Sequence, residues 1–85
     1  MAAGDMTRFT HVLKAKPAPK ITARELAKVR QDMDLSRGLF ARYLRTNVRT
    51  LENWEQGRAK PNAQAALLIR VVQRFPDTVR RLAEI

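Results

Sequence analysis

Apolar residues recur at helical spacing from residue 21 onward, in short segments that are separated by capping signals. Thr22 and Glu25 form a capping box at the start of the first segment, because each side chain can bond the other residue's backbone N–H group. The buried stripe that follows consists of Leu26, Val29 and Met33. The pattern predicts a helix that begins after Thr22 and breaks off between Asp32 and Asp34.

Two further short helices are predicted between Ser36 and Gly57, at a spacing that leaves almost no room for a loop. Ser36 and Asn47 are typical N-cap residues, and Gly57 is typical of the position just past a helix C-terminus. The apolar stripe of the first helix is Phe40, Ala41 and Leu44, and that of the second is Leu51 and Trp54. Helices joined by so short a turn cross at a steep angle, as in the helix pairs that read DNA.

A fourth helix is predicted from the Asn62 cap to Phe75, because the residue before Pro76 avoids the helical conformation. A short fifth helix should begin with Pro76 at its first position. In the fourth helix one apolar stripe comprises Ala65, Leu68, Ile69 and Val72, and further apolar residues lie to its side. A surface helix needs only one apolar face, so the surplus predicts a homodimer. Its interface would consist of Leu67, Val71, Phe75, Val79, Leu82 and Ile85, with a monomer as the open alternative.

Residues 1–20 carry scattered charge, glycine and proline without a sustained period, and predict an irregular tail with at most a short extended piece at 9–13. Residues 21–85 then form one all-α domain, near the size at which a single core is only marginally sufficient. No apolar run approaches the ~18 residues that would span a bilayer, and the first 20 residues lack the apolar segment of a signal peptide. We therefore expect a cytoplasmic protein with no membrane contact.

Charge points to a polyanionic partner. The 85 residues contain 17 Lys and Arg against 8 Asp and Glu, a formal charge of +9 and a pI near 11.4. That pI lies above the value of about 9 that is typical of nucleic-acid-binding domains. Two alternatives stay open: the charge serves only solubility, or the basic surface belongs to a structural module that binds an acidic protein.

The sequence offers little for catalysis or metal binding. It has no cysteine, which excludes disulfides and thiolate metal sites, and we expect the single histidine, His11, to be solvated. Glu52 and Glu55 lie three residues apart, yet carboxylates on a helix without a histidine or a polar cleft are a weak signal for acid–base chemistry. We expect no enzyme activity, no metal and no cofactor.

The polar residues around the helix pair divide by position. Arg49, Thr50 and Asn53 are left outside by the apolar stripe of the second helix, and have the length to reach base edges in a major groove. The flanking residues Arg37, Arg58 and Lys60 would meet phosphates, which set the register on DNA. Glu55 has little reason to face DNA, and Arg30 is its expected internal partner. Arg70, Arg74, Arg80 and Arg81 show no such arrangement and are expected to be solvated or partner-binding.

The stretch SRGLFARYLRTNVRTLENWEQGRAKPN resembles the helix-turn-helix signature of the phage-repressor-like (XRE, Cro/C1-type) regulators. The continuation QAALLIRVVQRFPDTVRRLAEI is similar to the HigA-type antitoxin branch of that family. The resemblance implies a compact five-helix domain that dimerises, binds a palindromic operator in double-stranded DNA, and neutralises a RelE/ParE-like toxin that cleaves mRNA. An ordinary XRE-family regulator without a toxin is the open alternative.

Carried over by position, the resemblance assigns roles to single residues. Base-facing positions fall on Val48, Arg49, Thr50 and Asn53, phosphate-contacting positions on Arg37 and Asn47, and an internal ion pair on Arg30 and Glu55. One departure is visible: the turn between the two helices usually holds glycine followed by an aliphatic residue, whereas Arg45 and Thr46 stand here. If Arg45 takes a positive φ, the backbone bears a cost of about 1 kcal/mol that glycine would avoid.

Overall fold

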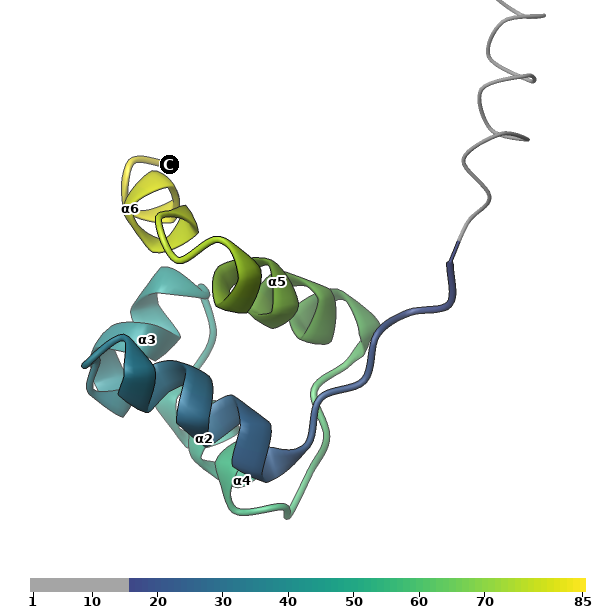
Figure 1. The fold of residues 1–85 in the computed structure, drawn as a ribbon. Coiled ribbons are helices and arrows are strands. Elements are labelled where there is room, and N and C mark those ends of the chain that lie inside the picture. The colour runs from purple at the N-terminus through teal and green to yellow at the C-terminus, as the bar shows by residue number, and fades with distance from the viewer. Residues whose placement is uncertain (1–15) are drawn as a thin grey trace, which may run out of the picture.

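Five short helices make up the fold of residues 16–85, the part of the chain that the computed structural model describes (Figure 1). They are α2 (Ala23–Asp32), α3 (Arg37–Tyr43), α4 (Val48–Glu55), α5 (Ala63–Arg74) and α6 (Thr78–Ala83). Within these residues there is no strand, so the predicted all-α fold is confirmed. The extended piece expected at 9–13, and His11, lie outside the described residues.

Side-chain caps start the first four of these helices where the sequence predicts. Thr22 Oγ1 accepts from Glu25 N at 3.1 Å while Glu25 Oε1 accepts from Thr22 N at 2.9 Å, which completes the capping box. Ser36 Oγ accepts from Leu39 N at 3.1 Å, and Asn62 Oδ1 from Ala65 N at 2.8 Å. Each cap satisfies a backbone donor that a helix N-terminus leaves unpaired.

Helix α6 begins two residues later than predicted. Pro76 is not its first residue, and Asp77 makes no side-chain cap. Instead the chain leaves α5 through a tight turn in which Thr78 N donates to Phe75 O at 2.9 Å and Val79 N to Pro76 O at 3.2 Å. Because this turn already pairs the first backbone donors, the helix needs no side-chain cap.

Three helices end in the same way, with one residue in the left-handed region. These residues are Asp34 after α2, Arg45 after α3 and Gly57 after α4, with φ of 59°, 56° and 76°. In each case the following N–H group reaches back five residues, as Thr46 N does to Ala41 O at 2.9 Å. This is the Schellman arrangement, for which glycine is the usual residue. Gly57 was predicted as such a residue, and Asp34 was not.

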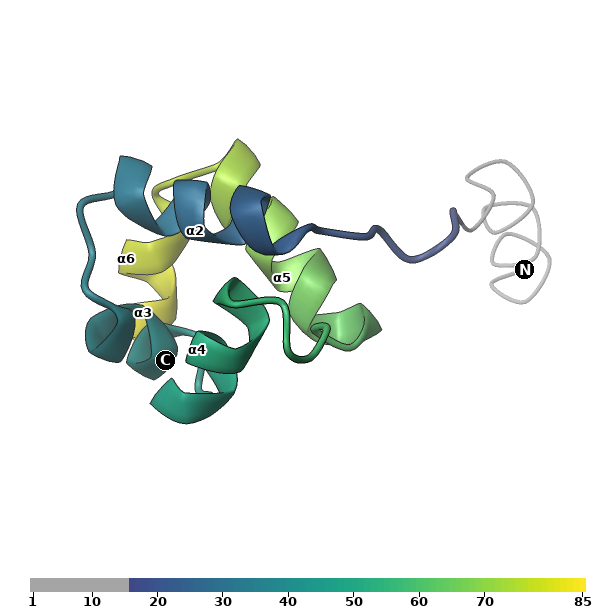
Figure 2. The same ribbon diagram turned by 90° about the horizontal axis from the view of Figure 1, so that it is seen from below.

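The core lies where the helices converge. Its buried side chains are Leu26, Val29, Phe40, Ala41, Leu51, Trp54, Ile69, Val72 and Val79. On α5 the buried stripe is Ala66, Ile69 and Val72, whereas Ala65 and Leu68, which we predicted in that stripe, are only half-buried. Helix α2 packs against α4 and α5, and α6 contacts α3 and α5 (Figures 1 and 2). This packing holds α3 and α4 side by side and leaves one side of α4 uncovered.

Candidate nucleic-acid interface

The turn 44–47 sets the angle between α3 and α4. Leu44 is the C-cap residue of α3. Arg45 follows it with a φ of 56°, so this arginine does adopt the left-handed conformation that glycine usually takes. Asn47 then starts α4: its Oδ1 accepts from Arg49 N at 2.7 Å. The Asn47 oxygen is therefore occupied by the cap, which leaves its amide N–H₂ group as the part able to donate to a phosphate.

Arg49 and Asn53 occupy the outward face of α4. Leu51 and Trp54 are buried on the opposite side, Arg49 is exposed, and Asn53 is partly exposed. Val48 at the start of the helix is 49% exposed, a high value for an aliphatic side chain. Thr50 differs from the prediction, because it lines a groove of about 430 Å³ with residues from the turn and the start of α5. Its side chain is partly exposed.

Asn53 and Arg58 lie together, although we assigned them to bases and phosphates separately. Arg58 Nη1 donates to Asn53 Oδ1 at 3.4 Å, across the Gly57 turn that ends α4. This contact occupies the amide oxygen and leaves the amide N–H₂ group outward. Lys60 is exposed in the same loop. The basic turn thus lies directly beside the outward face of α4.

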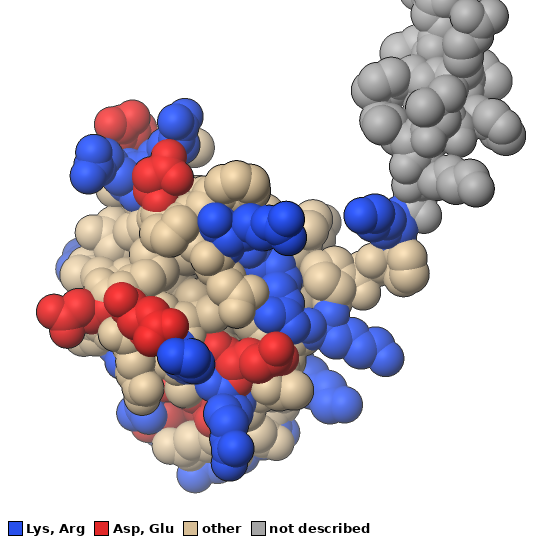
Figure 3. Space-filling view, viewed as in Figure 1, with Lys and Arg blue, Asp and Glu red and all other residues tan. Residues whose placement is uncertain are grey.

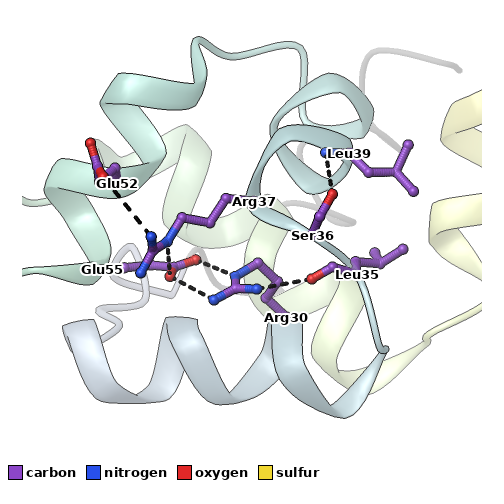
Figure 4. A network of polar contacts seen from close by, with 7 residues as sticks. All are labelled: Arg30, Leu35, Ser36, Arg37, Leu39, Glu52 and Glu55. Atoms are coloured by element: carbon purple, nitrogen blue, oxygen red, sulfur yellow. Dashed lines mark hydrogen bonds and ion pairs between the residues drawn. The ribbon is translucent and has the colours of Figure 1, made fainter.

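A cluster of two arginines and a buried glutamate braces α4 from behind (Figure 4). Arg30 on α2 binds Glu55 through both ends of its fork, Nε to Oε2 at 2.7 Å and Nη2 to Oε1 at 3.1 Å, and its Nη1 donates to Leu35 O at 2.9 Å. Arg37, the first residue of α3, donates from Nε to Glu55 Oε1 at 3.0 Å. A single carboxylate therefore joins α2, α3 and α4.

Burial and the two arginines shift the pKa of Glu55 in opposite directions. Its side chain is 2% exposed, and burial raises the pKa of the carboxyl, but the hydrogen bonds and charges of Arg30 and Arg37 outweigh burial and hold the pKa below its ordinary value. The same contact raises the pKa of Arg37, chiefly through its hydrogen bond to Glu55. We expected the pairing with Arg30 only. The contact between Arg37 and Glu55 was missed, because the two residues are 18 positions apart and no local pattern links them.

Arg37 is also placed differently from a free phosphate ligand. Its side chain is 42% exposed, with Nε committed to Glu55 and Nη1 at 3.9 Å from Glu52 Oε2. Two carboxylates therefore stand beside the guanidinium that we assigned to phosphate. A contact to DNA would use the remaining exposed edge of the fork.

Arg70, which we expected to be solvated or partner-binding, has internal partners. Arg70 on α5 donates from Nη2 to Lys20 O at 2.7 Å and to both oxygens of Glu25, at 3.1 and 3.2 Å, and from Nη1 to Gln73 at 2.9 Å. Hydrogen bonds from the Thr22 backbone, and then from Arg70, hold the pKa of Glu25 below its ordinary value. This clasp ties the segment that leads into α2 to the side of α5. Arg81 pairs with Asp77 one turn away on α6.

Only some of the residues predicted for the dimer interface are exposed on the surface. Leu67, Val71 and Phe75 lie four residues apart and are 54%, 36% and 58% exposed, so they form one apolar stripe along α5. Ile85 is 92% exposed. Val79 was assigned wrongly: it is 9% exposed and belongs to the core. Leu82 is half-buried and packs against the core from the same helix.

Charge is unevenly distributed over the surface. On the face of Figure 3, basic side chains dominate the right-hand and lower edges, whereas acidic and basic side chains alternate over α2 and α6.

Among residues 16–85 no cluster of potential metal ligands occurs, and no helix there is long and apolar enough to cross a membrane.

Fold and surface together define a small all-helical protein with a closely joined helix pair, whose second helix α4 presents Arg49 outward beside a basic turn. No family model matches the chain. It is 45% identical over 82 residues to the antitoxin HigA-2 of Vibrio cholerae serotype O1, an alignment that covers 96% of this chain and 79% of that protein. The chain therefore belongs to the family of HigA-type antitoxins.

Proposed function

We propose that the protein is the antitoxin of a two-gene operon, that it represses this operon by binding a palindromic operator as a homodimer, and that it neutralises a RelE/ParE-like mRNA-cleaving toxin. One observation carries the DNA-binding part: α4 turns Arg49 and Asn53 outward beside a basic turn, in a chain of charge +9. The antitoxin part rests on the relationship to HigA-2.

Base reading is assigned to the outward side of α4. Arg49 can donate two bonds to a guanine edge, and Asn53, with its oxygen held by Arg58, can donate to a base acceptor. Val48 would meet a thymine methyl group, and Thr50 would contribute from the flank. A two-fold dimer would place the two α4 helices about 34–36 Å apart, in successive major grooves of an inverted repeat.

Phosphate contacts are assigned to the residues around that face. Lys60 and Arg58 follow α4, Asn47 precedes it, and Arg37 offers its exposed edge. Such contacts set the register and give binding its salt dependence, because each neutralised phosphate releases counterions.

Gel-shift titrations on operator and scrambled DNA at several salt concentrations test this assignment. Arg49→Ala should lose about 1–3 kcal/mol of affinity for the operator and relax discrimination at one base pair, whereas Lys60→Ala should weaken both DNAs evenly and lower the salt slope by about one. Lys60 is a cleaner phosphate test than Arg37, since Arg37 also stabilises Glu55. Arg80→Ala is the control, because it removes one charge from exposed α6. Equal losses on both DNAs for Arg49→Ala would contradict base reading.

Dimerisation is assigned to the apolar stripe of α5 and to Ile85, which follows α6. A contiguous exposed apolar stripe favours a protein contact. Leu67→Lys should shift sedimentation equilibrium toward the monomer, while Leu39→Lys, at 39% exposure on α3, should not. If both variants keep the wild-type mass, the dimer lies elsewhere or does not form.

Co-expression with the product of the neighbouring reading frame tests the toxin. An antitoxin should restore growth and co-purify with that product. If it does neither, while sequence-specific DNA binding holds, the protein is an ordinary regulator of the XRE type.

A further inference from the structure

Arg45 makes contacts that go beyond its place in a turn. Its guanidinium donates from Nη1 to the carbonyl oxygens of Arg42 and Tyr43, at 3.1 and 3.2 Å, and from Nη2 to Leu82 O at 3.0 Å. The first two carbonyls belong to the last turn of α3, and the third belongs to the last turn of α6. One side chain therefore serves the C-terminal ends of two helices, and its contact with the second spans 37 residues of the chain.

These contacts complement the helix ends chemically. The last carbonyls of a helix have no partner within it and carry partial negative charge, so a cation that donates hydrogen bonds fits them well. The arginine side chain can reach three carbonyls at once, since its fork presents several donors in fixed directions. A glycine at this position would relieve the strain of the positive φ but would remove the side-chain donor; Arg42 O and Leu82 O would keep their backbone donors, Arg45 N and Ile85 N, each at 3.2 Å.

The bond to Leu82 O has no counterpart elsewhere on α6. Among residues 16–85, it is the single hydrogen bond between α6 and another helix or its adjoining turn, apart from the bonds that link α6 to the end of α5. Apolar packing of Val79 and Leu82 otherwise holds the six-residue helix. Apolar contacts resist separation, but they define direction less strictly than a hydrogen bond does.

We propose that Arg45 is a positioning residue that fixes α6 relative to the turn between α3 and α4, and thereby sets where Ile85, the part of the assigned dimer face that follows α6, stands relative to the reading helix. The inference rests on the proposed function, because α6 leads to Ile85 on the assigned dimer face and the turn leads to α4. Its consequence is specificity for the spacing of two half-sites. Loss of the guanidinium lets α6 move and relaxes that spacing.

Three substitutions of Arg45 separate the guanidinium from the backbone. Arg45→Gln removes the charge and keeps the strain of a side chain at positive φ, Arg45→Gly removes both the charge and the strain, and Arg45→Lys keeps the charge on a point donor. Arg42→Gln is the matched control, since it removes one charge from an exposed position at the end of the same helix.

The first measurement is amide hydrogen exchange of the free protein, which needs no DNA. In Arg45→Gln and Arg45→Gly the protection of α6 should fall by about three- to tenfold relative to α5, the factor that one net hydrogen bond contributes. Arg45→Lys should lose less, and Arg42→Gln should match the wild type. Unchanged protection of α6 in both Arg45 variants would overturn the proposal, whether or not the protein binds DNA.

The second measurement is affinity for operators whose half-sites are separated by the native spacing or by one or two base pairs more or fewer. Arg45→Gln and Arg45→Gly should discriminate between these spacings at least threefold less than the wild type, with base preference within each half-site unchanged. A purely structural role would lower affinity for every spacing alike, and that result would also overturn the proposal. If the wild type binds no DNA specifically, the proposed function fails while hydrogen exchange still decides the role of Arg45.

Discussion

Glu55→Gln removes the charge that joins α2, α3 and α4 and changes little else in shape. The carboxylate is 2% exposed and accepts from Arg30 twice and from Arg37 once. Arg30 is only 13% exposed and would stay buried without its charged partner, whereas Arg37, which is 42% exposed, can turn toward solvent. Breaking a buried pair by removing one partner costs about 3–5 kcal/mol, and the freedom of Arg37 places this case near about 3 kcal/mol.

Urea denaturation at pH 7 and fixed protein concentration measures this loss. With a slope of about 1 kcal/mol per molar urea for a domain of this size, the midpoint should fall by about 3 M. Glu52→Gln is the matched control, because Glu52 is 40% exposed and lies 3.9 Å from Arg37, a surface pair worth at most about 1 kcal/mol. Similar, small losses for both variants would show that the buried cluster does not stabilise the fold, and the reasoning would be refuted.

The remaining predictions concern pH, backbone strain, capping and the core. Because the folded pKa of Glu55 lies below its ordinary value of 4.5, this group stabilises the fold above that value and loses its contribution as the pH falls through the folded pKa; thermal unfolding at pH 7, 5, 4 and 3 should show a smaller decline for Glu55→Gln than for the wild type. Asp34→Gly should raise the free energy of unfolding by about 1 kcal/mol, since glycine accepts a φ of 59° without a side-chain clash, and a lower midpoint in urea would contradict this. Asn62→Ala should lower the free energy of unfolding by about 1 kcal/mol through loss of the α5 cap, as measured by thermal unfolding. No change would mean that the hydrogen bond of this cap does not stabilise the fold. Val79→Ala should lower the free energy of unfolding by about 2 kcal/mol. This loss should be the same at every protein concentration, whereas it would depend on concentration if Val79 lay in an interface between two copies.

Local signals were sufficient to predict most of the fold. Thr22, Ser36, Asn47 and Asn62 are polar caps that precede apolar stripes, and both features depend only on residues within one or two turns. Helix α6 is the exception, because it has six residues and its apolar side chains span less than two turns. Periodicity could not decide which of them face the core of the domain, and so Val79, which is buried there, was placed on the wrong side.

Apart from the predicted Arg30–Glu55 pair, the candidate site was less accessible to sequence reasoning where it depends on distant contacts. The outward position of Arg49 follows from the buried Leu51 and Trp54 on its own helix, and could be predicted. The bond from Arg37 to Glu55 spans 18 residues, and that from Arg45 to Leu82 spans 37. Each depends on how separate helices cross, which no repeating pattern in the chain encodes.

The clasp of Arg70 with Glu25 and the Lys20 carbonyl also determines which helices bear a force that is applied to the chain. The covalent path from residue 20 runs directly into α2, but the hydrogen bonds connect the same point to α5. A force applied along the chain ahead of Lys20 is therefore shared between two helices before it can unwind the first turn of α2. Helix α5 also carries the exposed apolar stripe, so tension at the N-terminal side of the domain acts on the element assigned to bring two protomers together.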